Sequence, residues 1–267
     1  MIRLILHPLI FILTLFNLVV AQSNHHTKGQ LYLSWGYNKE WYANSNLTFT
    51  QPTLGNELEF RNVKGNDKPG WNTGLFNKPL TIPQYNYRFG YFLNDKYLVE
   101  LNFDHTKFII PNQELHLIGK LNNRVVDTFF QRTNSNLAYQ LNNGANFFLF
   151  NFGIQYSLGS IAQSSFQQSI LFKAGIGFTY PHVQNTILGF DNKAGFQFGG
   201  FDTGLESSYK LSCYKWVYLE YAIKTVYARY RNLNIYEGKL DQNIFCFEMI
   251  LNLGFSINIL KKKALLN

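Results

Sequence analysis

Residues 82–104 read IPQYNYRFGYFLNDKYLVELNFD, and this stretch decides the predicted fold. In its first half, tyrosine, phenylalanine and other apolar residues alternate with polar or small residues at every second position. A period of two residues is typical of a β-strand that has one apolar and one polar face. The turn-forming residues Asn94, Asp95 and Lys96 follow, and the alternation resumes at Tyr97. The stretch therefore predicts a β-hairpin.

The same alternation recurs along most of the chain. It predicts strands at residues 31–38, 82–92, 97–104, 148–157, 170–179, 201–211, 217–224 and 245–258. The spacers between these strands are alternately long and short, which is typical of a barrel with short periplasmic turns and longer outward loops. We therefore predict an all-β fold, namely an up-and-down antiparallel transmembrane β-barrel of about eight strands with long extracellular loops.

The two longest spacers contain strand-like segments of their own, at residues 47–50, 57–63 and 116–130. We interpret these segments as strands that extend above the membrane. Counting them as spanning strands would instead give a barrel of about ten or twelve strands.

The composition favours a membrane barrel over a soluble one. Hydrophobic residues make up 46% of the chain and charged residues make up 15%, whereas a typical soluble domain has roughly 25% charged residues. One face of the predicted strands is rich in Gly, Ser, Asn and Gln, and the other is rich in Phe, Tyr, Ile and Leu. We expect the apolar face to meet lipid. A soluble lipocalin-like barrel with an apolar cup is the alternative, because the period alone does not say which face points outward.

The N-terminus predicts export. Arg3 is followed by an apolar run over residues 4–20, and Ala21 stands at a position suited to cleavage. This arrangement is typical of a secretory signal peptide. We predict a signal peptide at residues 1–21 and a single barrel domain at residues 22–267, located in the bacterial outer membrane.

The net charge of +8 is scattered along the chain. Its one cationic run, at residues 261–263, is short and has no interleaved aromatic residues. We therefore predict no nucleic-acid partner.

The barrel prediction assigns two groups of side chains. An eight-stranded barrel has an interior just wide enough for side chains, so we expect the lumen to be filled. The charged residues of the polar face are predicted to form a polar network there: Arg88, Glu100, Asp104, Lys173, Asp202, Glu206, Glu220, Lys224 and Glu248. Aromatic residues near the strand ends are predicted to lie at the membrane interfaces: Trp35, Tyr37, Trp41, Tyr42, Tyr180 and Trp216.

Several segments carry a resemblance to known proteins. SWGYN at residues 34–38, PQYNYR-x-GYF at residues 83–92 and AGIGF-x-YP at residues 174–181 resemble a family of small Gram-negative outer-membrane β-barrel proteins without an assigned activity. The final strand, NLGFSINI at residues 252–259, resembles the assembly signal of outer-membrane proteins, although the chain continues beyond it to Asn267. The resemblance implies a fold, a location and the outer-membrane assembly machinery as a partner, but no reaction.

The enzymatic alternative is a lipid A hydrolase or acyltransferase. Such an enzyme needs a nucleophile and a histidine that a carboxylate orients. The best candidates are Asp104 and His105, but the alternation directs these two side chains to opposite faces. The sequence has no Cys or His cluster with metal-ligand spacing, no phosphate-binding loop and no hydrolase elbow. We therefore predict no enzymatic activity, no metal and no cofactor.

By elimination, the function is predicted to lie in the outward loops at roughly residues 39–80 and 110–145, which combine aromatic residues with Asn, Lys and Arg. Ligand-binding residues are often on loops that a rigid scaffold positions. We predict a structural or surface-binding barrel whose partners are outer-membrane lipids and an unknown extracellular ligand. A narrow channel is a further alternative.

Overall fold

The computed structural model of the protein describes residues 26–68, 84–141, 144–160, 165–192, 195–214 and 216–260. The predicted signal peptide at residues 1–21 and the lysines at residues 261–263 lie outside the described residues. Among the described residues, no helix has the length and apolarity needed to cross a membrane.

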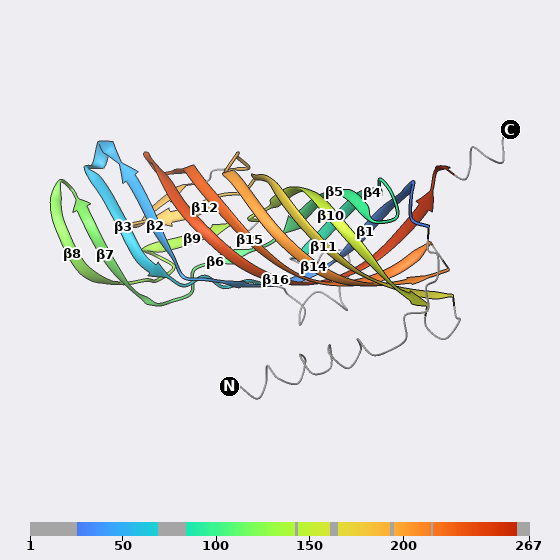
Figure 1. Cartoon of the computed structure of the whole chain (residues 1–267). Coiled ribbons are helices and arrows are strands. Elements are labelled where there is room, and N and C mark those ends of the chain that lie inside the picture. Colours follow the sequence, from blue (N-terminus) through green and yellow to red (C-terminus); the bar gives the residue numbers. More distant parts are fainter. Residues whose placement is uncertain are drawn as a thin grey trace, which may run out of the picture.

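Eight antiparallel strands close into a ring (Figure 1). In ring order they are β1 (Gln30–Tyr42), β4 (Tyr85–Phe92), β5 (Tyr97–His105), β10 (Phe147–Ser160), β11 (Phe166–Thr179), β14 (Gly200–Cys213), β15 (Val217–Ile235) and β16 (Gly238–Asn258). Pairing of β1 with β16, for example Trp35 with Leu253, closes the ring. The predicted up-and-down barrel of about eight strands is confirmed, and the additional strands counted in the ten- or twelve-strand alternative lie outside the ring.

An extracellular extension continues from the outer end of the barrel. The strands β2 (Ser45–Gln51), β3 (Asn56–Val63), β7 (Glu114–Leu121) and β8 (Arg124–Gln131) follow β16 in the same sheet, and the short 3-10 helix η1 (Pro52–Leu54) joins β2 to β3. A second sheet has the order β13 (Phe190–Asn192), β12 (Gln184–Ile187), β9 (Leu137–Leu141) and β6 (Phe108–Ile109). Figure 1 shows the β7–β8 hairpin at the end of the molecule opposite the C-terminus.

The extension matches part of the sequence prediction. The segments 47–50 and 57–63 lie in β2 and β3, above the ring as predicted. The segment 116–130, predicted as one strand-like piece, is instead the hairpin of β7 and β8. Asn122 and Asn123 form its two-residue turn with φ values of 50° and 62°. Asparagine tolerates this left-handed backbone better than most residues, so the Asn-Asn pair is the local cause of the reversal.

The two longest strands reverse their polarity along their length. In the inner part of β15, Glu220 and Lys224 are buried whereas Ile223 is exposed. Farther out on the same strand, Tyr230 is buried whereas Arg229 is exposed. Lipid surrounds the wall of a membrane barrel, and water surrounds the part that projects beyond the membrane. The reversal therefore marks where the wall leaves the membrane.

This reversal explains a difference between the predicted and the observed strand ends. The predicted strands at 217–224 and 245–258 stop where the apolar face changes side. In the structure both strands continue past that point and meet at a turn formed by Tyr236 and Glu237. The alternation of inward and outward side chains continues through the polarity change as far as Tyr230, and a register shift between Tyr230 and Leu233 then interrupts it before the turn.

The interior has three layers. At the periplasmic end, a small cluster contains Tyr32, Phe92, Leu98, Leu171 and Tyr218. The middle of the ring holds buried charged residues. The extracellular end has a larger hydrophobic core that joins both sheets to the ends of the barrel strands and includes Leu47, Phe49, Phe60, Phe108, Leu117, Leu137, Tyr139, Val226, Tyr230 and Leu240.

Two glycines make room for the aromatic rings of the periplasmic layer. A Cβ at Gly90 would overlap the ring of Tyr32, and a Cβ at Gly254 would overlap the ring of Tyr218. The absence of a side chain at these positions lets the two tyrosines lie flat against the barrel wall. Tyr32 then reaches inward, and its hydroxyl donates to Glu100 at 2.7 Å.

Candidate functional site in the lumen and on the extracellular sheet

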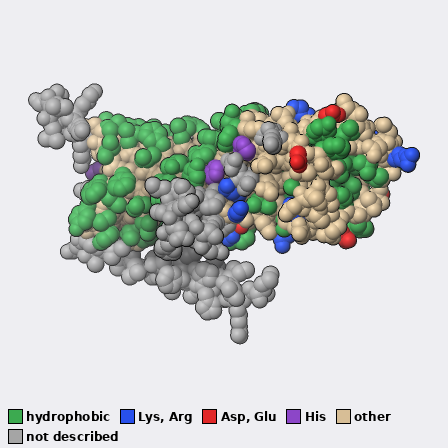
Figure 2. Space-filling view, turned by 180° about the vertical axis from the view of Figure 1, so that it is seen from behind, with side chains coloured by type: hydrophobic (Ala, Val, Ile, Leu, Met, Phe, Trp, Pro, Cys, Tyr) green, Lys and Arg blue, Asp and Glu red, His purple; other side chains and the backbone are tan. Residues whose placement is uncertain are grey.

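The outer wall of the ring is apolar. Large hydrophobic side chains with about half or more of their surface exposed occur on each strand of the ring, including Leu33, Phe89, Leu101, Phe150, Phe172, Ile176, Phe201, Leu205, Leu253 and Phe255. In Figure 2, hydrophobic side chains cover most of the visible barrel wall, whereas charged side chains gather toward the extracellular end. Such a wall is suited to hydrocarbon and not to water.

Five of the six predicted interfacial aromatic residues are directed away from the lumen or lie on a turn outside the ring: Trp35, Tyr37, Trp41, Tyr180 and Trp216. Tyr42 differs. Its hydroxyl donates to the carbonyl oxygen of Lys107 at 2.8 Å, and its ring packs edge-on against Phe108. Trp41 faces outward, so the alternation along β1 turns Tyr42 inward to the extracellular core.

Seven of the nine predicted lumen residues form one buried ion network: Arg88, Glu100, Asp104, Lys173, Glu206, Glu220 and Lys224. Each of these side chains is at most 2% exposed. Three cations thus lie among four carboxylates from five strands of the ring. Burial of charges is favourable only when they are paired and hydrogen-bonded, and this network meets that condition closely.

Two cations form the centre of the network. Arg88 donates to Asp104 at 2.6 Å and to Glu206 at 3.3 Å. Lys173 contacts Glu100 at 2.8 Å, Glu206 at 3.0 Å and Glu220 at 3.1 Å. The side chains therefore bridge the lumen between strands that are not neighbours in the sheet.

The third cation joins the network from another strand. Lys224 is paired with Asp104 and also donates to Asn102. Asn102 in turn donates to Asp104 at 2.9 Å, so this carboxylate is held by an amide as well as by two cations. All three side chains are buried in the lumen.

The remaining two predicted lumen residues are buried but lie outside this network. Asp202 and Glu248 make no ion pair with a described residue, and Asn38 donates to Glu248 at 3.5 Å. Sequence reasoning also missed two buried charged residues on the strands of the ring, Glu40 and Lys210. Glu40 is the next inward position after Asn38, and Lys210 is the next inward position after Ser208. Continuing each predicted alternation by two residues would therefore have found them.

Lys210 lies at the periplasmic end of the lumen. Its ammonium group is 3.9 Å from the centre of the Tyr218 ring, 5.1 Å from that of Tyr32 and 5.3 Å from that of Phe92. Cation–π contacts of this kind stabilise a buried ammonium group that has no carboxylate partner. Lys210 and these rings thus fill the inner end of the barrel beneath the ion network.

The structure does not bring the two candidate catalytic residues together. Asp104 lies in the lumen network, whereas the ring of His105 stacks on Tyr85 at 4.6 Å and contacts Asn146 through its Nδ1 atom at 2.8 Å. The two side chains project to opposite faces of β5, as the alternation predicted.

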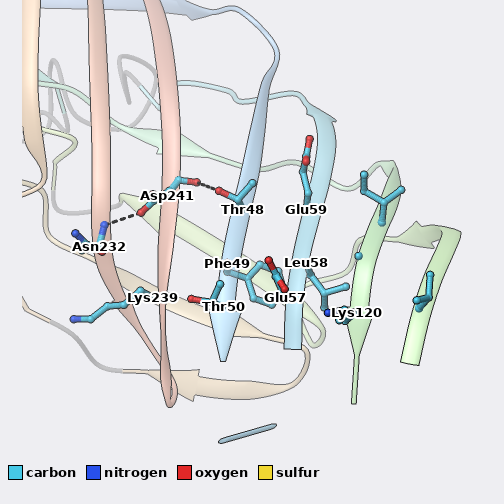
Figure 3. A pocket seen from close by; sticks show the side chains of 13 residues that line it. Thr48, Phe49, Thr50, Glu57, Leu58, Glu59, Lys120, Asn232, Lys239 and Asp241 are labelled. Atoms are coloured by element: carbon cyan, nitrogen blue, oxygen red, sulfur yellow. Dashed lines mark hydrogen bonds between the residues drawn. The ribbon is translucent and has the colours of Figure 1, made fainter. Parts of the chain in front are cut away.

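A groove of about 450 Å³ lies on the outer face of the extracellular sheet (Figure 3). It is lined by Thr48, Thr50, Glu57, Glu59, Ile118, Lys120, Val125, Asn232, Lys239 and Asp241, among others. Figure 3 shows acidic and basic side chains on neighbouring strands along the groove, with threonines between them. Asn232 and Asp241 are held together because the backbone N–H of Asn232 donates to the carboxylate of Asp241 at 2.7 Å.

Strand β8 bounds the sheet beside this groove. It pairs with β7 along one edge, and no described strand pairs with its other edge. Val125 is 83% exposed and Phe129 is 70% exposed. The predicted outward loops were expected to display aromatic residues. Among their described aromatic residues, Phe49, Phe60 and Tyr139 are instead buried in the extracellular core, and Tyr42 and Phe130 pack against it. Trp41 and Phe129 are exposed.

These observations define the class of the protein. A closed eight-stranded ring with an apolar outer wall and a polar, filled interior is an integral β-barrel of the outer-membrane type. In this chain the barrel also carries the extracellular β extension.

No known protein-family model matches the sequence, and no curated protein matches it. Solved structures that resemble the chain include the outer membrane protein OprG from Pseudomonas aeruginosa, with a TM-score of 0.46, 11% identity and coverage of 87% of this chain and 98% of that one. The outer membrane protease OmpT from Escherichia coli has a TM-score of 0.38, 12% identity and coverage of 88% and 99%. Ail of Yersinia pestis, in complex with the heparin analogue sucrose octasulfate, has a TM-score of 0.35, 11% identity and coverage of 86% and 99%.

Proposed function

We propose that the protein is a non-enzymatic surface-binding barrel. In this proposal the ring anchors the chain in the outer membrane, and the extracellular sheet binds a ligand in the groove of Figure 3. The single observation that carries the proposal is this groove, which is open to the outside and lies on a sheet with a hydrophobic core of its own.

The core supports the proposal because it holds the groove in a defined shape. Phe60 and Leu47 are fully buried behind the sheet, and Leu117 is 3% exposed. A binding surface that is ordered before the ligand arrives loses less conformational entropy on binding than a flexible loop does. The extension therefore provides an ordered surface within the segments that were predicted to be outward loops with strands of their own.

The chemistry of the groove supports binding rather than catalysis. The carboxylate residues Glu57 and Asp241, the lysines Lys120 and Lys239 and the apolar Ile118 line the same groove. A surface with both charges and a few apolar side chains is suited to orient a polar ligand. Within the described residues, no three or more His, Cys, Asp or Glu side chains form a group that could hold a metal ion.

Reversing the charge of both groove lysines, Lys120→Glu with Lys239→Glu, is expected to weaken ligand binding at least roughly tenfold, since losses of more than about 1 kcal/mol are typical of central contacts. The probes are arrays of immobilised glycans and extracellular-matrix proteins, and the measurement is binding of the detergent-refolded protein. Lys64→Glu is the matched control, because Lys64 is exposed but does not line the groove. Equal binding by all variants would contradict the proposal.

The wild-type barrel is expected to show no conductance steps in planar bilayers, because the ion network and the Lys210 aromatic cluster occupy successive levels of the lumen. A known porin inserted under the same conditions serves as the positive control. Reproducible steps from the wild-type protein would favour the narrow-channel alternative. The corresponding measurement for the enzymatic alternative is the lipid A mass spectrum of cells that express the wild-type protein or His105→Ala.

We also propose that the assembly machinery recognises the last strand. Residues 252–258 form the inner end of β16, which pairs with both β1 and β15 and so closes the ring. The strand that completes closure is a suitable signal, because its edge toward β1 stays unpaired until the barrel closes.

A further inference from the structure

We propose that the extracellular ligand is an extended polypeptide segment that pairs with the open edge of β8 and adds one strand to the extracellular sheet. This inference rests on the proposed surface-binding function and names the class of ligand. It follows from the hydrogen-bonding register of the β7–β8 hairpin, from the side chains beside its open edge and from the regularity of that edge.

The register identifies which backbone groups face outward. A two-residue turn makes the flanking residues Leu121 and Arg124 a hydrogen-bonded pair, and bonding then alternates along an antiparallel hairpin. Val125, Asp127 and Phe129 are thus non-hydrogen-bonded positions with respect to β7. Their N–H and C=O groups are directed to the open edge.

Two observed hydrogen bonds support this register at the end of the strand. The N–H of Arg132 donates to the carbonyl of Gln113 at 2.9 Å, on the β7 side. The carbonyl of Gln131 accepts from the Asn136 side chain at 2.9 Å. Consecutive residues thus bond on opposite sides, as the alternation requires, and Asn136 covers the last position of the open edge.

The chemistry of the open edge selects the ligand. Val125, Asp127 and Phe129 each present one donor and one acceptor, at intervals of two residues or about 6.8 Å. An extended polypeptide carries donors and acceptors at the same interval, and strand addition is a known mode of peptide recognition. Sugars and lipid headgroups have no such regular alternation.

The side chains beside the edge define the preferred sequence of the added strand. Val125 and Phe129 are highly exposed and flank Asp127, whose side chain is 76% exposed. Asp127 is paired with His116 at 2.6 Å, and the His116 ring stacks on Phe129 at 5.3 Å. Apolar side chains opposite Val125 and Phe129, with a basic side chain between them, would complement this row.

The groove continues from this row of side chains. Val125 lines the groove together with Ile118 and Lys120 of the neighbouring strand. A strand added to β8 would therefore place its outward side chains beside the groove, so that backbone pairing and side-chain contacts contribute to the same site.

The edge also has little protection. Proteins shield free edges with charged residues, especially lysine, with proline, with bulges or with very short strands. Strand β8 has eight residues without lysine or proline, its charged residues are Arg124 and Asp127, and its pairing with β7 has no register shift. The edge strands of the second sheet, by contrast, are β13 with three residues and β6 with two. The second sheet thus has short edge strands, whereas the extracellular sheet ends in a long edge strand, β8.

The test uses the full refolded chain and fluorescently labelled peptides in which isoleucine, lysine and isoleucine occupy alternate positions. We expect binding in fluorescence anisotropy and a loss of roughly tenfold or more for Phe129→Ala and for Asp127→Lys. N-methylation of the peptide amides that face β8 is expected to abolish binding, whereas N-methylation of the intervening amides is not. Scrambled peptides with the same composition are the control for charge.

The outcomes separate this inference from the proposed function. Two outcomes would overturn strand addition and leave the groove function intact. In the first, the peptides bind but the position of N-methylation has no effect. In the second, the peptides do not bind, while binding of array ligands still depends on Lys120 and Lys239. Failure of both peptides and array ligands would contradict both. Concentration-dependent dimerisation that Phe129→Ala removes would assign the edge to a second copy of the chain and would also overturn the inference.

Discussion

Replacing Arg88 by methionine is expected to lower the free energy of unfolding of the barrel by about 3–5 kcal/mol, as is typical when one partner of a buried ion pair is removed. Arg88 is fully buried and approaches three carboxylates, Asp104 at 2.6 Å, Glu206 at 3.3 Å and Glu100 at 3.8 Å. Without the guanidinium group, four carboxylates of the network would share the two remaining cations, Lys173 and Lys224. Methionine preserves much of the volume, so the loss reports charge rather than a cavity.

The measurement is a urea titration of the detergent-refolded protein, followed by the migration difference between boiled and unboiled samples on a gel. Arg231→Met is the matched control. Arg231 lies 3.6 Å from Asp241 in an ion pair whose side chains are 29% and 41% exposed, and solvent-accessible pairs contribute only about 0–1 kcal/mol. Equal urea midpoints for Arg88→Met and Arg231→Met would contradict the view that the buried carboxylates of the lumen need Arg88 to balance their charge.

The second large effect is expected for Phe60→Ala, which should destabilise the extracellular extension by about 3–5 kcal/mol. Phe60 is fully buried, and its ring lies 5.7 Å from Phe49 and 5.2 Å from Phe130. Removal of the phenyl group leaves a cavity in the extracellular core. The eight-stranded barrel lies outside this cavity, so we expect local unfolding of the extension while the barrel remains closed.

Limited proteolysis distinguishes local from global unfolding. Trypsin is expected to cleave Phe60→Ala rapidly near Arg61 and Lys64, while the barrel fragment keeps its altered migration on an unboiled gel. Phe129→Ala is the matched control, because Phe129 lies in the same extension but is 70% exposed. Loss of the closed barrel in Phe60→Ala would show instead that the ring and the extension fold as one unit.

Much of the fold could be predicted because a barrel strand has a local signature. Two-residue alternation depends only on backbone geometry, so it marks each strand without knowledge of its neighbours. Tyr85 to Phe92 and Tyr97 to His105 illustrate this, since both strands match the predicted segments within a few residues. The membrane adds a second local signal, because lipid requires the outward residues of every spanning strand to be apolar.

The same reasoning failed where the solvent changes along a single strand. Tyr230 is buried and Arg229 exposed, although the inner part of β15 has buried Lys224 and exposed Ile223. A prediction that requires the same face to be apolar along the whole strand therefore ends the strand at this reversal. Alternation alone, without regard to which face is apolar, would have extended the strand to Tyr230, after which a register shift breaks the two-residue period.

The candidate site divides in the same way. The alternation placed Arg88, Asp104 and Glu206 on the inward face, because the local sequence of each strand determines which side chains point inward. It could not pair them, since Arg88 and Glu206 are 118 residues apart and meet only because the ring closes. The groove likewise could not be predicted from the sequence, because it requires β2 to pair with β16, where Thr50 and its partner Lys239 are 189 residues apart.

The sequence of this protein therefore specifies strands, faces and a membrane location, all of which depend on short-range periodicity and on the solvent that each face meets. Strand order, closure and the extracellular sheet depend on pairing between distant segments. The open edge of β8 depends on both. The two asparagines at 122 and 123 define the hairpin locally, but only the tertiary structure leaves one side of that hairpin without a neighbouring described strand.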